Sequence, residues 1–430
     1  MEFINKFFRL EERSTSVGTE FLAGMTTFLA MSYILVVNSA ILSDSGMEFD
    51  RVLTATAIAA ITGSLLMGLL ANFPIAQAPG MGLNAFFTYG VVFGFGFSFQ
   101  QALAAVFVSG VLFVLISLSG LREKVINVIP NNLKFAIGGG IGLFIAYIGL
   151  VNAGMVNLSG VVPEIGAFEG TALIAWIGLV ATVILYVLKV KGAIFLGIIV
   201  SSVIAMAFGV ADLPTAAVSA PAAPYFGAFL EGFAGLDLIA FAIVVFSMLF
   251  VDFFDTAGTL ISVGPQAGLI NKDGELENVG GALLADSVAT VVGAAVGTSN
   301  TTSYIESLAG IEEGGRTGLT SVFTALFFVA FLFLTPLLSA VPQFASSPAL
   351  IFVGILMAGQ LRFIEWDDVE VAIPAFLTIL VMPLTYSIAD GIAIGFIFYT
   401  LVKVFKGKYK EVDPLLYILS ALFVLYFFVA

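Results

Sequence analysis

Apolar runs long enough to cross a membrane recur along almost the whole chain, with short polar stretches between them. A helix needs about 20 mostly apolar residues to cross roughly 30 Å of hydrocarbon. The first half of the chain has such candidates at 21–42, 52–72, 75–93, 101–120, 133–151, 171–188 and 192–210. The second half has them at 239–263, 280–296, 298–311, 318–338, 349–361, 371–386 and 391–405. The pattern predicts an all-α polytopic membrane protein with 14 transmembrane segments.

The basic residues agree with this order of segments. Cytoplasmic loops of membrane proteins carry an excess of Lys and Arg. If the N-terminus is cytoplasmic, only Arg51 falls on the outer side. The predicted inner loops hold Lys6, Arg9, Arg13, Arg122, Lys124, Lys134, Lys189, Lys191, Lys272, Arg316, Arg362, Lys403, Lys406, Lys408 and Lys410. A last apolar run at 414–430 is left as either a further span or an interfacial helix.

Seven segments in each half give the two halves opposite orientations, which is an inverted repeat. The hydropathy of residues 170–200 resembles that of residues 369–399, including a glycine between the paired segments. Pro130 before the fifth segment is expected to correspond to Pro348 before the twelfth. Inverted repeats of this kind are typical of secondary transporters.

The third and tenth segments are poor membrane helices. The third, FPIAQAPGMGLNAFFTYGVV, contains Pro74, Pro79, Gly80 and Gly82, and the tenth has polar side chains at all positions from 299 to 303. Each is predicted to be a short extended stretch followed by a half-helix. Interrupted segments at matching places of two halves point to a binding site at the membrane midplane. The alternative is a pair of kinks packed against neighbouring helices.

Composition restricts the chemistry available. The chain is 60% hydrophobic and 10% charged with a mean hydropathy of +1.10, far outside the range of soluble domains. It has no Cys and no His, so we expect no disulfide, metal site or cofactor, and any proton chemistry must use carboxylates. The net charge of −13 is spread over short loops, so we expect no nucleic-acid partner. The N-terminus does not resemble a cleaved signal peptide.

Few ionisable residues lie inside the predicted segments. Each costs at least about 2.5 kcal/mol at the bilayer centre, so each is a functional candidate. Asp255 is the clearest, because Asp252, Asp255 and Thr259 share one face of a helix and Gly258 leaves room beside them. Glu306 follows the polar stretch of segment ten. A buried carboxyl group can carry a proton and can hydrogen-bond a planar polar ligand.

The other polar residues in the segments have plainer alternatives. Asp286 lies in a stripe of small residues, which favours a hydrogen bond that locks a helix, although it is also a candidate proton carrier. Asp252 could instead face water in a loop. Asn84 and Asn38 are weaker candidates, because a single amide in a helix bundle often joins two helices.

Four spaced motifs carry a resemblance to a known family: EFLAGMTTFLAMSYILVVN, QAPGMGLNAFFTYGVV, VDFFDTAGTL and ADSVATVVGAAVGTSNTTSYIESLAGIEEGGRTGLT. Together they are similar to the AzgA-like purine permeases of the nucleobase/ascorbate transporter family, also called nucleobase–cation symporter family 2. The similarity covers nearly the whole chain. One departure is that Asn38 is followed by Ser39, where the family motif usually has proline, which concerns only the end of that helix.

The resemblance implies a fold of two inverted repeats divided into a core domain and a gate domain that move in an elevator-like way. The expected parts are a cytoplasmic N-terminus (1–18), core domain (19–120 and 237–340), gate domain (121–210 and 341–410), an extracellular loop (211–236) and a C-terminal apolar segment (411–430).

The resemblance also implies site residues. The acids in DTAG and TTSYIES, Asp255 and Glu306, are expected to contact the substrate, and Asn84 matches a polar position of segment three. The candidate substrate-binding set is Asp255, Glu306, Asn84, Thr259, Thr302, Ser303 and Phe86. The candidate proton-coupling set is Asp255, Glu306 and Asp286.

The leading hypothesis is a proton-coupled symporter in the plasma membrane that imports purine nucleobases and forms a homodimer. Guanine and hypoxanthine are the expected substrates, with adenine next. The alternative is an anion or ion transporter or channel on the same fold, but no Lys or Arg lies in the middle of a predicted span to hold an anion. A membrane aspartyl protease that pairs Asp255 with Asp390 is a weaker possibility, so no enzyme activity is expected.

Overall fold

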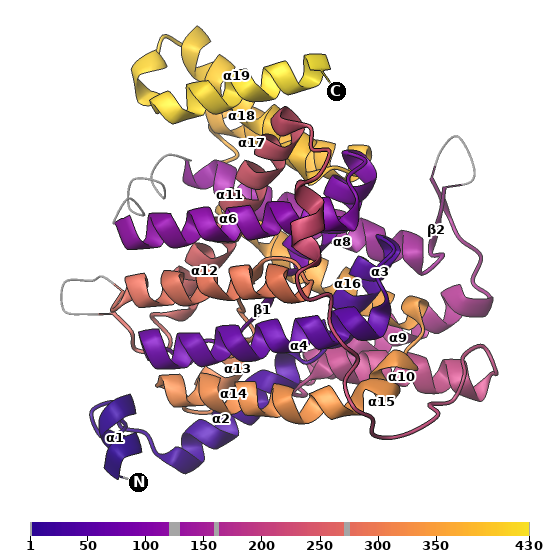
Figure 1. The fold of residues 1–430 in the computed structure, drawn as a ribbon. Helices are drawn as coiled ribbons and strands as arrows, with labels where there is room; N and C mark the ends of the chain where they lie inside the picture. The colour runs from indigo at the N-terminus through magenta and orange to yellow at the C-terminus, as the bar shows by residue number, and fades with distance from the viewer. Residues whose placement is uncertain (1, 120–129, 159–162, 271–275, 430) are drawn as a thin grey trace.

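The computed structural model describes residues 2–119, 130–158, 163–270 and 276–429. Almost all of its regular structure is helical. Arg122, Lys124 and Lys272, which were used to predict the orientation, lie outside the described residues. Figure 1 shows most of the long helices running side by side across the molecule.

The elements follow one another as the hydropathy pattern predicts. The first half contains α1 (Glu2–Phe8), α2 (Val17–Met31), α3 (Ile34–Asp44), α4 (Phe49–Leu66), β1 (Gln77–Pro79), α5 (Met81–Ala85), α6 (Phe99–Ser119), α8 (Asn131–Asn152), β2 (Val156–Asn157), β3 (Glu164–Ile165), α9 (Gly170–Val187) and α10 (Ala193–Ala207). The second half contains α11 (Leu238–Val263), α12 (Val279–Val296), β4 (Thr301–Ser303), α13 (Ser307–Glu312), α14 (Gly318–Phe331), α15 (Thr335–Ser339), α16 (Gln343–Ala358), α17 (Val369–Thr385), α18 (Ile388–Phe405) and α19 (Pro414–Val429).

Short helical pieces of other pitch complete these elements. Two π-helical pieces, Met67–Ala71 and Phe86–Gly94, continue α4 and α5. Turns of 3₁₀-helix occupy Ala228–Phe233, Leu332–Leu334, Gly359–Phe363 and Tyr409–Glu411.

Within the described residues, 10 helices are long and apolar enough to cross a membrane, and four shorter apolar helices accompany them. The chain is therefore a mostly helical, polytopic membrane protein. Every predicted segment has an element at its place. The count of 14 crossings and the inverted repeat stay predictions.

One sequence correspondence was wrong. Pro348 does not precede the twelfth segment but lies inside α16. The residue at the helix start is Pro342, the N-cap of α16, just as Pro130 is the N-cap of α8. The hydropathy pattern placed the start too late, because Gln343 and two serines open this helix before its apolar run.

The helices pack mainly in two groups. One group contains α2, α3, α4, α6, α11, α12, α13 and α14, and the other contains α8, α9, α10, α16, α17 and α18. Glycines allow close approach in both: a Cβ on Gly318 would overlap the carbonyl oxygen of Gly68, and one on Gly354 would overlap that of Gly142. A core and a gate domain that move against each other stay a prediction.

A buried carboxylate joins the first span to the start of α14. Glu20 is fully buried and accepts the backbone N–H groups of Arg316 (3.0 Å), Thr317 (3.3 Å) and Thr320 (3.1 Å), and the Thr320 hydroxyl (2.6 Å). The first N–H groups of a helix have no partner within the helix, and its N-terminus favours negative charge. Glu20 thus caps α14 from a distant part of the chain.

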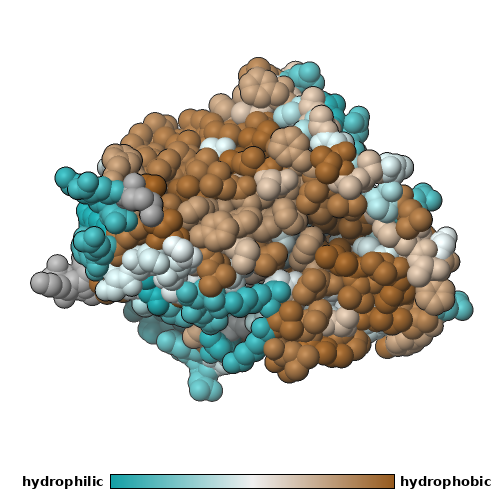
Figure 2. Space-filling model, turned by 90° about the horizontal axis from the view of Figure 1, so that it is seen from below, coloured by the Kyte–Doolittle hydropathy of each residue, from teal (hydrophilic) through white to brown (hydrophobic). Residues whose placement is uncertain are grey.

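The face of the molecule that Figure 2 shows is suited to lipid. Figure 2 shows hydrophobic residues over most of the face seen from below, with hydrophilic residues collected mainly at one end and along the lower edge. The C-terminal run forms α19, which packs on α18: the hydroxyls of Thr400 and Ser420 are 2.8 Å apart, and the Phe396 and Phe423 rings meet edge to face. The chain thus ends in an apolar helix laid against the last predicted span.

Candidate binding site at two crossing strands

The two interrupted segments meet each other inside the helix bundle. β1 and β4 pair antiparallel in the register Gln77↔Ser303, Ala78↔Thr302 and Pro79↔Thr301. The Gly80 N–H also donates to the Asn300 carbonyl (2.9 Å) and the Tyr304 N–H to the Ala76 carbonyl (3.0 Å). The extended stretches predicted at these places are present. Backbone groups that no helix satisfies are paired across the two segments.

A glycine is required at position 80, directly after β1, where the chain passes close to Thr302 of the paired strand β4. A Cβ at this position would lie 2.8 Å from Thr302 Oγ1 and 2.9 Å from Thr302 Cγ2. Both atoms belong to a buried side chain, so the strand could not stay in place. Gly80, which the sequence marked as one cause of a poor membrane helix, is therefore the point where the chain contacts Thr302.

Hydroxyl groups from two helices hold the strands in position. On α12, the Thr290 hydroxyl donates to the Thr301 carbonyl (3.1 Å) and its oxygen accepts the Thr301 N–H (3.0 Å). On α4, the Ser64 oxygen accepts the Gln77 N–H (3.0 Å) and its hydroxyl donates to the Gln77 carbonyl (3.1 Å). Thr290 thus completes the backbone hydrogen bonding of Thr301, and Ser64 that of Gln77.

Glu306 stands directly before α13, and its carboxylate is held by a tyrosine. The Tyr33 hydroxyl donates to Glu306 Oε1 at 2.6 Å. Tyr33 is buried and lies between the end of α2 and the start of α3. From this position its hydroxyl group reaches Glu306, just after β4. Glu306 itself is only partly buried.

Tyr33 was missed by the sequence reasoning. It is one aromatic residue in the apolar run MSYILVV, and nothing in that run separates it from a lipid-facing or core tyrosine. The family motif quoted above contains it, but hydropathy did not indicate the helix break that turns it toward Glu306.

Asp255 lies on α11 beside strand β4. Its carboxyl group interacts with the Thr302 side chain, and Glu306 is close enough to act on it electrostatically. Asp255 is partly buried, and Thr259 one turn away is 8% exposed. A Cβ on Gly258 would meet nothing within 4 Å, so there is open space on this face of the helix. Asp255, Thr259, Thr302 and Glu306 therefore form one cluster around β4.

Asp252 and Asp286 each brace the strand region through one carboxylate oxygen, while the other oxygen of each is buried without a hydrogen-bond partner among the described residues. Asp252 Oδ2 accepts the Asn300 amide (2.9 Å) and lies 3.1 Å from the Thr290 hydroxyl oxygen, whose single proton it shares with the Thr301 carbonyl. Asp286 Oδ1 accepts the Gln77 amide (2.8 Å) and the Thr256 hydroxyl (2.7 Å). Both carboxyl groups are buried behind the strands. Asp286 therefore makes hydrogen bonds of the kind that the sequence analysis considered, which hold neighbouring segments together. Its role in proton coupling stays a prediction.

The remaining predicted residues differ in their surroundings. The Asn84 side chain is buried, with its amide 3.5 Å from the Pro79 carbonyl oxygen and its oxygen accepting from Ser299. Ser303 accepts the Gln77 amide at 3.3 Å. Phe86 is fully buried with its ring against Gly90. The structure brings Asn84 and Ser303 to the crossing strands, whereas Phe86 packs in the surrounding core.

Asn38 joins helices rather than lining the site. Its amide donates to the Thr56 hydroxyl oxygen (2.7 Å) and to that of Thr298 (2.9 Å). It therefore links α3 and α4 to the residues that lead into β4. This is the interhelical role that we considered for a single buried amide.

Comparisons with known proteins agree with the resemblance seen in the motifs. The model of the Xan_ur_permease family, described as a permease family, matches residues 18–394. The chain is 49% identical over 434 residues to the guanine/hypoxanthine permease PbuG of Bacillus subtilis, covering 98% of each chain. It is 39% identical over 427 residues to the adenine permease AdeQ of Escherichia coli, covering 98% of this chain and 95% of the other.

A solved structure shows the same fold at low identity. The transmembrane domain of the cyanobacterial bicarbonate transporter BicA superposes with a TM-score of 0.62 at 15% identity, covering 86% of this chain and 96% of that one. This likeness shows the architecture alone. The family match spans most of the chain and is one of permeases rather than enzymes, so the chain belongs to the xanthine/uracil permease family.

Proposed function

We propose that this protein imports purine nucleobases, guanine and hypoxanthine in the first place and adenine next, together with protons. The observation that carries the proposal is that Asp255 and Glu306 lie close to each other beside β4, with open space at Gly258 on the helix that carries Asp255. The identity of 49% to a guanine/hypoxanthine permease supports the choice of purine.

The polar groups on the edges of a purine match the hydrogen-bonding groups of Asp255 and Glu306. It is a flat, neutral ring with N–H donors and with N and O acceptors on its edges. Carboxylates accept N–H donors in strong, charge-assisted hydrogen bonds. A protonated carboxyl group can instead donate. We assign Glu306 and Asp255 to two polar edges of the base, with Thr302, Ser303, Thr259 and Asn84 contributing to the remaining contacts and Phe86 to the apolar wall.

The proposed mechanism moves the whole site across the membrane. The helices that carry β1, β4, Asp255 and Glu306 pack mainly with one another, which is what an elevator movement of a core against a gate requires. Asp255 and Glu306, with Asp286 as a further candidate, would bind the coupled proton. We place the protein in the plasma membrane with its N-terminus in the cytoplasm, and propose a homodimer.

The composition of the site does not favour an anion as the substrate. Within the described residues, none of the recorded ion pairs joins Asp255 or Glu306 to a Lys or Arg. Two carboxylates without a nearby cation repel a negative ligand. A neutral base meets no such barrier.

The direct test is ligand binding by the purified protein. Its thermal unfolding temperature in detergent is measured with guanine, hypoxanthine, adenine, uracil, a purine nucleoside and bicarbonate. We expect the purine bases to raise it, because a ligand that binds only the folded state stabilises that state. Stabilisation by bicarbonate or the nucleoside, with none by any purine base, would contradict the proposal.

Replacing Tyr33 by Phe is expected to raise the KM for the purine several-fold with a smaller effect on the maximal rate. The ring is kept, but Glu306 loses the 2.6 Å hydrogen bond that orients it. One hydrogen bond to a charged group contributes about 1.5–3 kcal/mol. Uptake into proteoliposomes measures both constants. Tyr417→Phe, on the C-terminal helix, is the matched control, and equal kinetics for the two variants would contradict the role given to Tyr33.

A further inference from the structure

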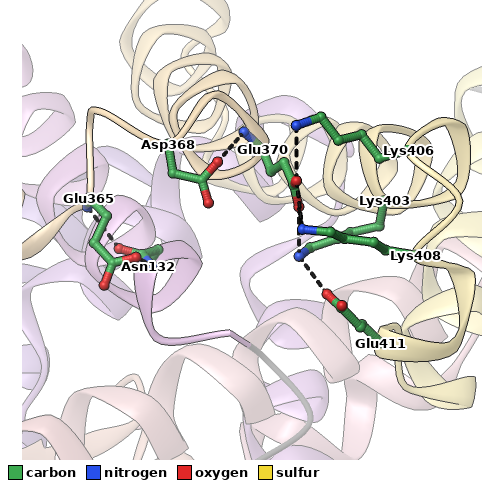
Figure 3. A network of polar contacts seen from close by, with 8 residues as sticks. All are labelled: Asn132, Glu365, Asp368, Glu370, Lys403, Lys406, Lys408 and Glu411. Carbon is green, nitrogen blue, oxygen red and sulfur yellow. Dashed lines mark hydrogen bonds and ion pairs between the residues drawn. The ribbon is translucent and has the colours of Figure 1, made fainter.

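The densest basic segment of the chain lies at the end of α18 and makes its contacts outside the candidate binding site. Lys403, Lys406, Lys408 and Lys410 fall within eight residues. Three of them converge on Glu370 in the first turn of α17, with Nζ–Oε distances of 2.9 Å (Lys403), 3.0 Å (Lys406) and 2.7 Å (Lys408) (Figure 3). The network joins α17 to α18 and to the turn that follows.

The charges in this network do not balance. One carboxylate faces three ammonium groups, and Glu411 pairs with Lys403 alone (2.9 Å). The Glu370 side chain is 5% exposed, whereas Lys406 and Lys408 are 56% and 43% exposed. The hydrogen bond to Glu370 raises the pKa of Lys408, so this ammonium stays charged. Each ammonium has three donors, so both exposed lysines can bind a further acceptor.

Two acidic residues close to Glu370 in the sequence form hydrogen bonds elsewhere and not with these lysines. Asp368 accepts the backbone N–H of Glu370 (2.9 Å) as the cap of α17. The Glu365 carboxylate accepts the Asn132 amide (3.4 Å) at the start of α8. Figure 3 shows both on the side of Glu370 away from the lysines. Among the described residues, the carboxylate that forms ion pairs with Lys406 and Lys408 is that of Glu370, and Glu411 adds an electrostatic contribution at Lys408.

Exposed aromatic residues occur in the two segments that this network joins. Phe405, next to Lys406, is 86% exposed, and Tyr409 and Trp366 are 55% and 43% exposed. Trp and Tyr gather at membrane–water interfaces, and lysines near helix ends reach toward the headgroups. An exposed Phe405 beside the ammonium groups offers an apolar contact to an acyl chain.

We propose that Lys406 and Lys408 bind the phosphate of an anionic phospholipid headgroup, which completes the network between α17 and α18. One lysine is enough to neutralise Glu370 and to join α17 to α18, and the mostly buried Lys403 already does so. Two further lysines that are half-exposed beside an apolar surface suit a ligand that is anionic at one end and apolar at the other.

The test compares soluble lipids on the purified full-length protein. Dioctanoyl phosphatidylglycerol, dioctanoyl phosphatidylcholine and inorganic phosphate are titrated while the thermal unfolding temperature is measured. We expect stabilisation by phosphatidylglycerol only. In Lys406→Gln/Lys408→Gln, the half-maximal concentration is expected to rise about tenfold or more, since each lysine near the surface contributes to binding an anionic lipid. Native mass spectrometry should show a matching loss of retained phosphatidylglycerol.

Three comparisons decide the outcome. Lys406→Arg/Lys408→Arg should keep the wild-type response, and Lys6→Gln/Lys189→Gln, which removes the same charge at exposed positions elsewhere, should also keep it. If the double Gln variant does not fold, Lys406→Gln is used alone. Equal responses of the Gln variant and wild type, or equal stabilisation by phosphatidylcholine, would overturn the proposal. Equal stabilisation by inorganic phosphate would overturn the lipid assignment.

Discussion

Replacing Glu306 by Gln is expected to lower purine uptake by about 100-fold or more. The substitution keeps the size of the side chain but removes its charge and one of its two acceptor oxygens. One of those oxygens accepts the Tyr33 hydroxyl. Loss of a charge-assisted hydrogen bond of about 3 kcal/mol corresponds to roughly a 100-fold weaker interaction. The initial rate of radiolabelled hypoxanthine uptake into proteoliposomes measures the effect.

Glu312→Gln is the matched control for this prediction. Glu312 ends the same short helix that follows Glu306, but its side chain is exposed. The Glu312→Gln variant should transport purines at the wild-type rate. Both variants are also tested for ligand-induced stabilisation, because a lost binding site removes that stabilisation and a misfolded protein shows no cooperative unfolding. Wild-type uptake by Glu306→Gln would show that Glu306 does not contact the substrate.

Much of the architecture can be predicted from the sequence, because a bilayer imposes a simple rule on hydropathy. Each apolar run had to be a helix, since no other single segment satisfies its backbone in lipid. The same rule identified the two exceptions: Pro79, Gly80 and the polar residues 299–303 cannot form a good spanning helix, and β1 and β4 occupy these places. The family resemblance added the pairing of Asp255 with Glu306.

The contacts between distant segments could not be predicted in this way. Hydropathy describes each segment by itself, so it gave no sign that Gln77 would reach Asp286 or that Tyr33 would reach Glu306. It also misjudged Pro348, because proline is tolerated inside a packed membrane helix as well as at its start. The sequence favoured a helix-locking hydrogen bond for Asp286 and left Asp252 open, but it could not name the partners that the structure shows for both.

Replacing Asp255 by Asn is expected to uncouple purine movement from the proton gradient. Asn keeps the shape of the side chain and can still hydrogen-bond Thr302, but it cannot take up and release a proton. In wild-type proteoliposomes, an inward proton gradient should accelerate uptake and drive accumulation, and a protonophore should abolish both. In Asp255→Asn, uptake should be the same with and without the gradient, while exchange of labelled for unlabelled base continues.

The Asp286→Asn variant distinguishes the proposed proton coupling by Asp255 from a purely structural role of a buried carboxyl group. Asp286 is buried and accepts hydrogen bonds from Gln77 and Thr256, so its substitution should lower the unfolding temperature without removing the response to the gradient. Asp255 is partly exposed beside the space at Gly258 and should show the reverse: near-normal stability and a lost response. A gradient response that survives in Asp255→Asn but disappears in Asp286→Asn would transfer the proton site to the carboxyl group behind the strands. That result would mean that the proton and the base are held by different groups, with the Gln77 amide, which donates to Asp286 Oδ1 (2.8 Å) and to Ser303 (3.3 Å), as the contact between Asp286 and β4.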